Sequence, residues 1–192
     1  MKIMARYFLI LFFIVISGCA HKISFHEIDY SIGTQEHDAG LTVVMDSHTL
    51  NSEVSIKSFM TGIANNWDVQ PGKMVKQVAD IELPQMFKDY RFSKLYPEAP
   101  PHITLEITIP KYEFASFRAT FILRAKAYSA DKKVYFDNSY TEVGVSQGAK
   151  MFWGGAFAMK SAIRQSSFGA LKNIFASLRR DLAKVLVQNK ID

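Results

Sequence analysis

The feature that most constrains the fold is a run of strictly alternating segments between residues 102 and 146. In ITLEITI, residues 103–109, aliphatic side chains occupy every second position and polar side chains occupy the positions between them. Because successive side chains of a strand point to opposite faces, this pattern predicts a strand with one buried face. The alternation recurs over residues 117–128 and, after the turn sequence SADKK, over 134–145. We therefore predict an antiparallel meander of three strands, in which Pro110 ends the first strand or bulges it.

Two segments with helical periodicity flank this meander. From Pro71 to Tyr90 apolar residues recur at steps of three and four, which predicts an amphipathic helix with a kink or a second helical piece at Pro84. A longer apolar stripe over residues 163–186 predicts a second amphipathic helix. A short apolar run at 40–45 predicts a buried strand. The order strand, helix, three strands, helix predicts an α+β two-layer sandwich, with two amphipathic helices packed on an antiparallel meander sheet.

The N-terminal segment indicates export from the cytoplasm. Lys2 and Arg6 precede an unbroken apolar run over residues 7–16, and small residues follow it. A basic start, an apolar run of about 10 residues and small residues at its end are typical of a signal peptide. A transmembrane helix needs about 20 apolar residues. We therefore expect residues 1–18 to be a removable signal rather than a membrane span.

The only cysteine of the chain directly follows this segment. The sequence ISGC, residues 16–19, resembles the lipobox of bacterial lipoproteins, although Ile16 stands where leucine is commoner. The resemblance implies cleavage between Gly18 and Cys19, a diacylglycerol on the sulfur, and an acyl chain such as palmitate on the new amine. A plain signal peptide with a chance cysteine, or an uncleaved apolar anchor, are the alternatives. No aspartate follows the cysteine, which implies by the same resemblance the outer membrane, at its periplasmic face.

This interpretation divides the chain into three parts. Residues 1–18 are the signal, 19–39 are the acylated cysteine with a polar tether, and 40–192 form a single periplasmic α+β domain. A domain of this size buries roughly 70% of its unfolded surface, so it does not depend on disulfides. Within the domain, residues 46–66 are rich in Ser, Thr and Asn and predict a long loop with a short strand inside 53–59.

Charge and motifs exclude several classes of function. The whole chain carries a net charge of +5, and its basic residues concentrate in the C-terminal quarter, where they face anionic headgroups or simply solvent. No nucleic-acid motif is present, and an exported protein has little access to nucleic acid, so we expect no nucleic-acid partner. We likewise expect no cofactor.

No pattern typical of an enzyme or a metal site is found. No two histidines have the spacing that places two ligands on one helix face, and there is no nucleophile elbow. Ser166 and Ser167 lie inside the last predicted helix and are interpreted as small residues for close packing or for contact with backbone. We therefore expect a non-enzymatic protein without a metal.

Two apolar features are candidates for binding. Trp67, in NNWDVQPG, either fills the core or anchors a partner, because tryptophan is enriched at binding hot spots. The run MFWGGAFAM, residues 151–159, either starts a packed helix, dips into a membrane interface, or contacts a partner. Our hypothesis for a partner surface combines Trp67, Phe152 and Trp153.

With the lipobox, the order of elements and the segment NNWDVQPGKMVKQVADIELPQMF, the chain resembles small envelope lipoproteins of Gram-negative bacteria. The nearest types are the YajG-type lipoproteins and the auxiliary lipoproteins of ABC-type lipid transport systems, of the paraquat-inducible C-subunit type. The resemblance covers roughly residues 40–188 and includes the closing segment SAIRQSSFGALKNIFASL. The polar insert at 46–66 and the WGG run depart from it.

The resemblance implies a non-enzymatic accessory subunit of a cell-envelope complex that moves phospholipid or lipopolysaccharide between membranes. Two alternatives stay open. One is a lipid- or glycan-binding module, with an acyl chain as ligand in a groove between helix and sheet. The other is a regulator of cell-wall synthesis.

Overall fold

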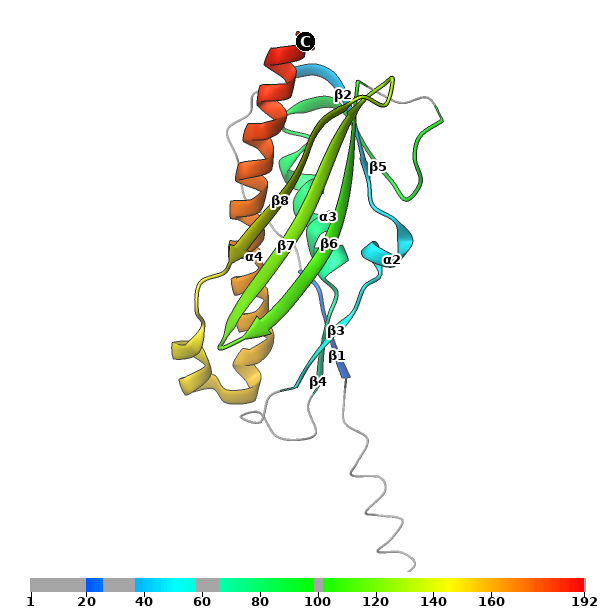
Figure 1. Ribbon diagram of the computed structural model, residues 1–192. Coiled ribbons are helices and arrows are strands. Elements are labelled where there is room, and N and C mark those ends of the chain that lie inside the picture. The colour runs from blue at the N-terminus through cyan, green and yellow to red at the C-terminus, as the bar shows by residue number, and fades with distance from the viewer. Residues whose placement is uncertain (1–19, 26–36, 58–65, 99–101, 192) are drawn as a thin grey trace, which may run out of the picture.

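A five-stranded mixed sheet forms the centre of the computed structural model, which describes residues 20–25, 37–57, 66–98 and 102–191 (Figure 1). The strands lie in the order β5-β2-β6-β7-β8 and span Phe87–Ser93 (β5), His37–Val44 (β2), Ile103–Ala115 (β6), Arg118–Ser129 (β7) and Val134–Val143 (β8). β6, β7 and β8 form the predicted antiparallel meander. β2, however, pairs in parallel with both β5 and β6, so the complete sheet is mixed.

The two-residue alternation correctly identified the buried face of the meander. Alternate residues of β7 from Ala119 to Ala127 are buried, as are Ile103, Leu105 and Ile107 of β6. The pairing of β6 with β7 shifts register between Thr108 and Lys111. The bulge predicted at Pro110 is therefore present, and β6 continues beyond it.

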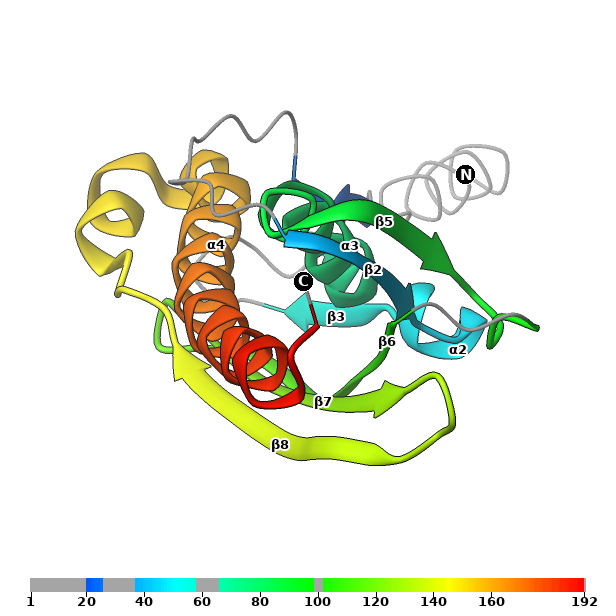
Figure 2. The ribbon, with the colours of Figure 1, turned by 90° about the horizontal axis from the view of Figure 1, so that it is seen from above.

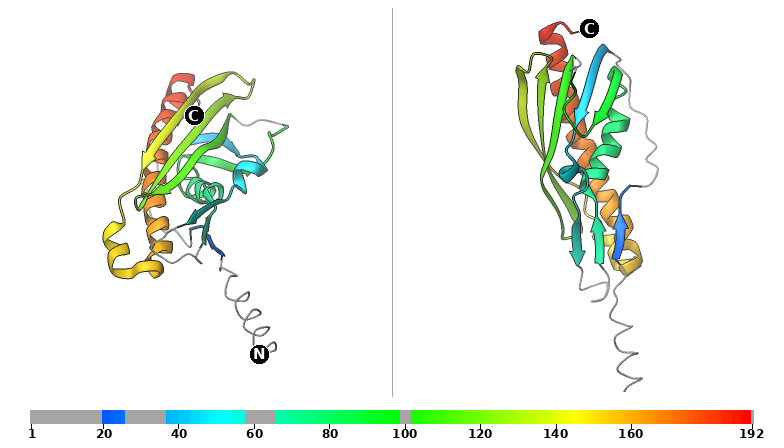
Figure 3. Two further views of the ribbon diagram at one scale, coloured as in Figure 1. Left: turned by 60° about the horizontal axis from the view of Figure 1, so that its bottom comes forward. Right: turned by 90° about the vertical axis from the view of Figure 1, so that its right-hand side faces the viewer.

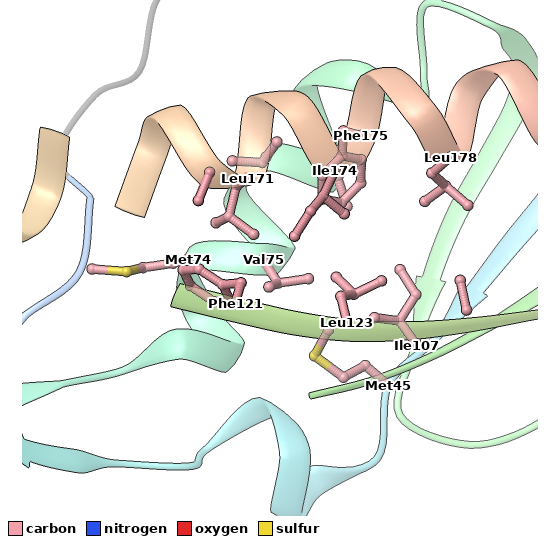
Figure 4. Close-up of a cluster of buried hydrophobic side chains, with 14 of the residues drawn as sticks. Met45, Met74, Val75, Ile107, Phe121, Leu123, Leu171, Ile174, Phe175 and Leu178 are labelled. Atoms are coloured by element: carbon pink, nitrogen blue, oxygen red, sulfur yellow. The ribbon is translucent and has the colours of Figure 1, made fainter. Parts of the chain in front are cut away.

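Two helices cover one face of this meander, which confirms the predicted α+β class. α3 spans Pro71–Glu82 and α4 spans Gly148–Asn189, and both lie on the same side of β6, β7 and β8 (Figure 2). Leu171, Phe175 and Leu178 of α4 point toward Phe121 and Leu123 of β7 (Figure 4). All five side chains are fully buried. The space between these parts of the helix and the sheet is therefore packed core.

The segment after Pro84 corrects the predicted second helical piece. α3 ends at Glu82, and the chain then forms β5 beside β2. Proline cannot continue a helix without losing a hydrogen bond and clashing with the preceding turn. The apolar residues Met86, Phe87 and Tyr90 have helical spacing, but backbone pairing with β2 decides their conformation.

A second, three-stranded sheet contains the start of the described chain. Its order is β1-β4-β3, with bounds Ala20–Ile23 (β1), Asn66–Val69 (β4) and Val54–Lys57 (β3). β1 runs parallel to β4, with Ala20 opposite Asn66. Residues 20–25, predicted as part of a tether, thus belong to the fold, while Gly18, Cys19 and 26–36 lie outside the described residues.

The predicted loop at 46–66 contains a helical turn as well as β3. α2 (Ser47–Leu50) is capped by Asp46, whose carboxylate accepts hydrogen bonds from the Thr49 amide and hydroxyl, both at 2.8 Å. These hydrogen bonds, that of the amide first, lower the pKa of Asp46. α2 packs tightly on α3, because a Cβ on Gly72 would lie 2.1 Å from the Thr49 carbonyl oxygen.

α4 is a helix of 42 residues, and its first turns lie at an angle to the rest (Figures 1 and 3). Asp181 ties it to the meander, because Tyr140 Oη and Asn138 Nδ2 of β8 donate to its carboxylate at 2.8 and 3.0 Å. Burial raises the pKa of Asp181, but hydrogen bonds from Lys184, Tyr140 and Asn138 outweigh it, so the net shift is downward. Across the described ranges, no helix is both long and apolar enough to cross a membrane.

Candidate interaction surfaces

Three of the most exposed large apolar side chains in the described part of the chain lie in the first turns of α4. Phe152, Trp153 and Phe157 are 77%, 87% and 98% exposed, and we call them the aromatic end of α4. The rings of Phe152 and Trp153 meet edge to face, with centroids 5.2 Å apart. Met151 and Met159, close to them in the helix, are buried. One side of this short stretch therefore packs on the protein and another presents aromatic rings to the surroundings.

β1 is fixed at the same end of the molecule. Arg164 Nε of α4 donates to the Ser24 carbonyl oxygen at 2.8 Å, and the Phe25 ring meets Phe168 of α4 edge to face at 5.8 Å. The Phe25 amide also donates to Gln77 Oε1 of α3 at 3.1 Å. Figures 1 and 3 show β1 and the start of α4 at the same end of the molecule, opposite the C-terminus. The two residues that follow β1 are therefore held against both helices.

Over most of its length α4 carries basic residues but no acidic ones. Between Gly148 and Arg180 the sequence has no Asp or Glu, and its basic residues are Lys150, Lys160, Arg164, Lys172, Arg179 and Arg180. Arg179 pairs with the buried carboxylate of Glu82 at 3.3 Å. Lys150 and Lys160 flank the aromatic end in sequence. An aromatic surface with basic neighbours in sequence therefore lies at the end of the molecule that holds β1.

The structure corrects the predicted partner surface of Trp67, Phe152 and Trp153. Trp67 lies in β4 and is only 3% exposed, within the core. It shares the inward face of the strand with Val69, while Asn66 and Asp68 are less buried. The alternation in NWDV was a signal for this placement that the sequence analysis did not use. Phe152 and Trp153 are exposed, but without Trp67.

A second surface, not predicted from the sequence, lies on the face of β6 and β7 opposite α4. A cleft of about 470 Å³ is lined by Tyr96, Pro97, Glu98, Thr104, Tyr128, Ser129 and Lys132. At its edge, Glu106 Oε2 accepts hydrogen bonds from Tyr96 Oη at 2.5 Å and from Tyr128 Oη at 3.1 Å. The two tyrosine rings meet edge to face, with centroids 6.4 Å apart. We call this site the Glu106 cleft.

The electrostatics of the Glu106 cleft suit binding better than proton transfer. Burial, and then the hydrogen bond to Glu106, raise the pKa of Tyr96 further above its ordinary value, at which a phenol is already protonated at neutral pH. A smaller hollow of about 220 Å³ continues past Glu106 to Arg124 and Lys126. Arg124 is itself held by Asp137, with Nε–Oδ1 at 2.7 Å and Nη2–Oδ2 at 2.6 Å. Aromatic rings, a carboxylate and cations in one cleft can recognise a polar, hydroxyl-rich ligand.

The remaining chemical candidates have structural roles. Among the described residues no group of three or more His, Cys, Asp or Glu is arranged to hold a metal ion. Ser166 and Ser167 are fully buried, as their interpretation as packing residues requires. Ser166 Oγ accepts the Ala119 amide at 2.8 Å, and Ser167 Oγ lies 3.1 Å from Tyr112 Oη. Their hydroxyls therefore bond the helix to the sheet.

Comparison with known proteins assigns no family. No family model matches the sequence, and no curated protein matches it either. Among solved structures, protein XCC0632 from Xanthomonas campestris, described as DUF330, matches with 15% identity and a TM-score of 0.42 over 84% of this chain and 98% of its own. An uncharacterized protein matches with 12% identity and a TM-score of 0.47, over 85% and 99%. The hypothetical protein CT253 from Chlamydia trachomatis matches with 10% identity and a TM-score of 0.41, over 76% and 95%.

Proposed function

We propose that this protein is a lipid-anchored accessory subunit of a bacterial cell-envelope complex, without enzymatic activity of its own. Cys19 is the lipid-bearing residue, and residues 1–18 are the export signal removed before it. The resemblance to YajG-type lipoproteins and to auxiliary lipoproteins of ABC-type lipid transport systems suggests a complex that moves lipid. The location that follows is the periplasmic face of the outer membrane.

The observation that carries the anchor is the position of β1. The strand begins at Ala20, the residue directly after the cysteine, and pairs with β4 from its first residue. A chain already paired at the residue after Cys19 would keep this pairing if everything before the cysteine were removed. Such a chain has no slack between the attachment point and the domain, so the domain would rest close to the membrane.

The anchor can be tested by metabolic labelling. Cells producing the protein are grown with labelled palmitate, and the wild type is compared with Cys19→Ser. We expect label on the wild type and none on the variant, together with retention of the variant's uncleaved signal. Absence of label on the wild type would refute the anchor.

The Glu106 cleft is the surface that we assign to recognition by the complex. It lies on the sheet face opposite α4, and of its two tyrosines Tyr96 is exposed and Tyr128 is partly buried. A photoreactive amino acid in place of Lys132, which lines the cleft, should crosslink to another envelope protein in intact cells. The same residue in place of the exposed Lys94 is the matched control. Equal crosslinking from both positions would contradict this assignment.

A second candidate function is a glycan-binding module, and the chemistry of the same cleft favours it. Tyrosine rings stack on sugar faces, and carboxylates and cations hydrogen-bond to hydroxyl groups. The cleft volume of about 470 Å³ lies within the range of about 300–1,000 Å³ that is usual for ligand sites. Native mass spectrometry of the purified protein distinguishes the two functions. A retained carbohydrate that Tyr128→Ala loses would support the module, whereas a bare protein that crosslinks from Lys132 supports the accessory subunit.

A further inference from the structure

The geometry points to the aromatic end of α4 as a second membrane contact, whose rings insert into the interface of the bilayer that holds Cys19. This inference rests on the proposed anchor, because it takes the position of the bilayer from that cysteine. Its occupant is a phospholipid surface with anionic headgroups. The domain would then be held at two points and in one orientation.

The side chains are those that an interfacial contact requires. Trp153 and its neighbours Phe152 and Phe157 project from a short helical stretch whose methionines are buried in the protein. Tryptophan is enriched at membrane–water interfaces, where its ring is partly apolar and its N–H stays hydrated. Helices that lie in the interface combine such rings with basic residues on the polar side. An exposed cluster of this kind is unfavourable in water and marks an interaction site.

The position of β1 places this cluster at the height of the anchor. Ser24 contacts Arg164, and the next residue, Phe25, contacts Phe168, so the strand and α4 rise in the same direction. From Ser24 back to Ala20 the strand covers about 13 Å, at about 3.3 Å per residue. The same distance along α4 is about nine residues at 1.5 Å each, which leads from Arg164 back to about residue 155. A lipid on Cys19 would therefore enter the bilayer near the level of Phe157, and the angled first turns of α4 lie at this same end of the molecule (Figure 1).

The charge near the cluster fits an anionic surface. Lys150 and Lys160 flank the rings, and the nearest acidic residues in sequence are Glu142 and Asp181. Basic residues near a membrane of anionic lipids are attracted by its negative surface potential. A second copy of the chain would bring the same positive charge to the surface, which disfavours association between copies there.

Fluorescence quenching tests the inference with the full-length, lipid-modified protein. The protein is reconstituted into vesicles of phosphatidylethanolamine and phosphatidylglycerol, with and without bromine on the acyl chains, and is compared with Trp153→Phe. The variant keeps an aromatic ring, and its remaining tryptophan is the buried Trp67. We expect a several-fold larger loss of emission with brominated lipid in the wild type than in the variant. Equal loss in the two proteins overturns the inference.

Palmitate labelling of the same preparation separates this inference from the anchor. Label without quenching at Trp153 means that the anchor stands and the second contact does not exist. Quenching without label means that the aromatic contact stands and the anchor does not.

A photoreactive amino acid at Phe157 identifies the occupant directly. Lipid adducts in intact cells support the membrane, whereas adducts to a second copy or to another protein overturn it. Val187 is the matched control, because it lies near the far end of the same helix and is also highly exposed. We expect no lipid adducts from that position.

Discussion

Ser166 supplies the sharpest test of how α4 is fastened to the sheet. Its hydroxyl accepts the Ala119 amide at 2.8 Å, and both residues are fully buried. The Ala119 carbonyl oxygen accepts the amide of Gly144, the residue directly after β8, at 2.8 Å. Ser166→Ala removes the hydroxyl acceptor and leaves the Ala119 N–H without that hydrogen bond in a site closed to solvent. A buried donor that loses its partner costs about 1–3 kcal/mol. We therefore expect the free energy of unfolding to fall by about 2 kcal/mol.

The measurement is chemical and thermal unfolding of the purified protein, followed by circular dichroism. For a domain of this size, about 2 kcal/mol corresponds to a fall in Tm of roughly 4–8 °C. The matched control is Ser161→Ala in the same helix, where the serine is exposed and the change should stay within about 0.5 kcal/mol. If Ser166→Ala is no more destabilising than Ser161→Ala, the hydroxyl does not satisfy the Ala119 amide and the reasoning is wrong.

Three further changes probe other contacts by denaturant unfolding. Gly144→Ala should lower the free energy of unfolding by about 3 kcal/mol or more, because its Cβ would lie 1.9 Å from a carbonyl oxygen of α4. Its control is Gly169→Ala, which should be neutral or stabilising because the new Cβ would meet nothing within 4 Å. Arg179→Met should lower the free energy of unfolding by about 3 kcal/mol, since Glu82 loses the cation 3.3 Å from its buried carboxylate. A loss under about 1 kcal/mol would contradict this. At neutral pH Asp181→Asn should have a free energy of unfolding about 1 kcal/mol below that of the wild type, allowing for solvent screening. Because the pKa of Asp181 is lowered by folding, that difference should vanish as pH falls below about 4, and a constant difference would refute the assigned hydrogen bonds.

Local periodicity was sufficient for the meander and for both helices. The buried face of β7 and the bulge at Pro110 depend on the order of side chains along one segment, so the sequence reveals them directly. The packing role of Ser166 and Ser167 was also correct, although their hydroxyls contact the sheet rather than the backbone of their own helix.

The features that depend on distant pairing were missed. AHKI in β1 is too short to show a period, and only its pairing with β4 makes it a strand. β5 carries apolar residues at helical spacing but is fixed by β2. The Glu106 cleft joins Tyr96 to Tyr128, and the register of Thr104 opposite Tyr128 brings their segments together. This register cannot be deduced from the order of side chains along either segment alone.

The length of α4 determines how far the domain extends from the first turns of this helix. At 1.5 Å per residue, the part of this helix beyond Met159 is about 45 Å long. With its first turns at a bilayer, the sheet that packs along the helix would begin close to the lipid, because the Gln147 amide just before α4 donates to the Phe117 carbonyl oxygen in the β6–β7 turn. Only a partner that extends about this far from the lipid could then contact the C-terminal end of α4.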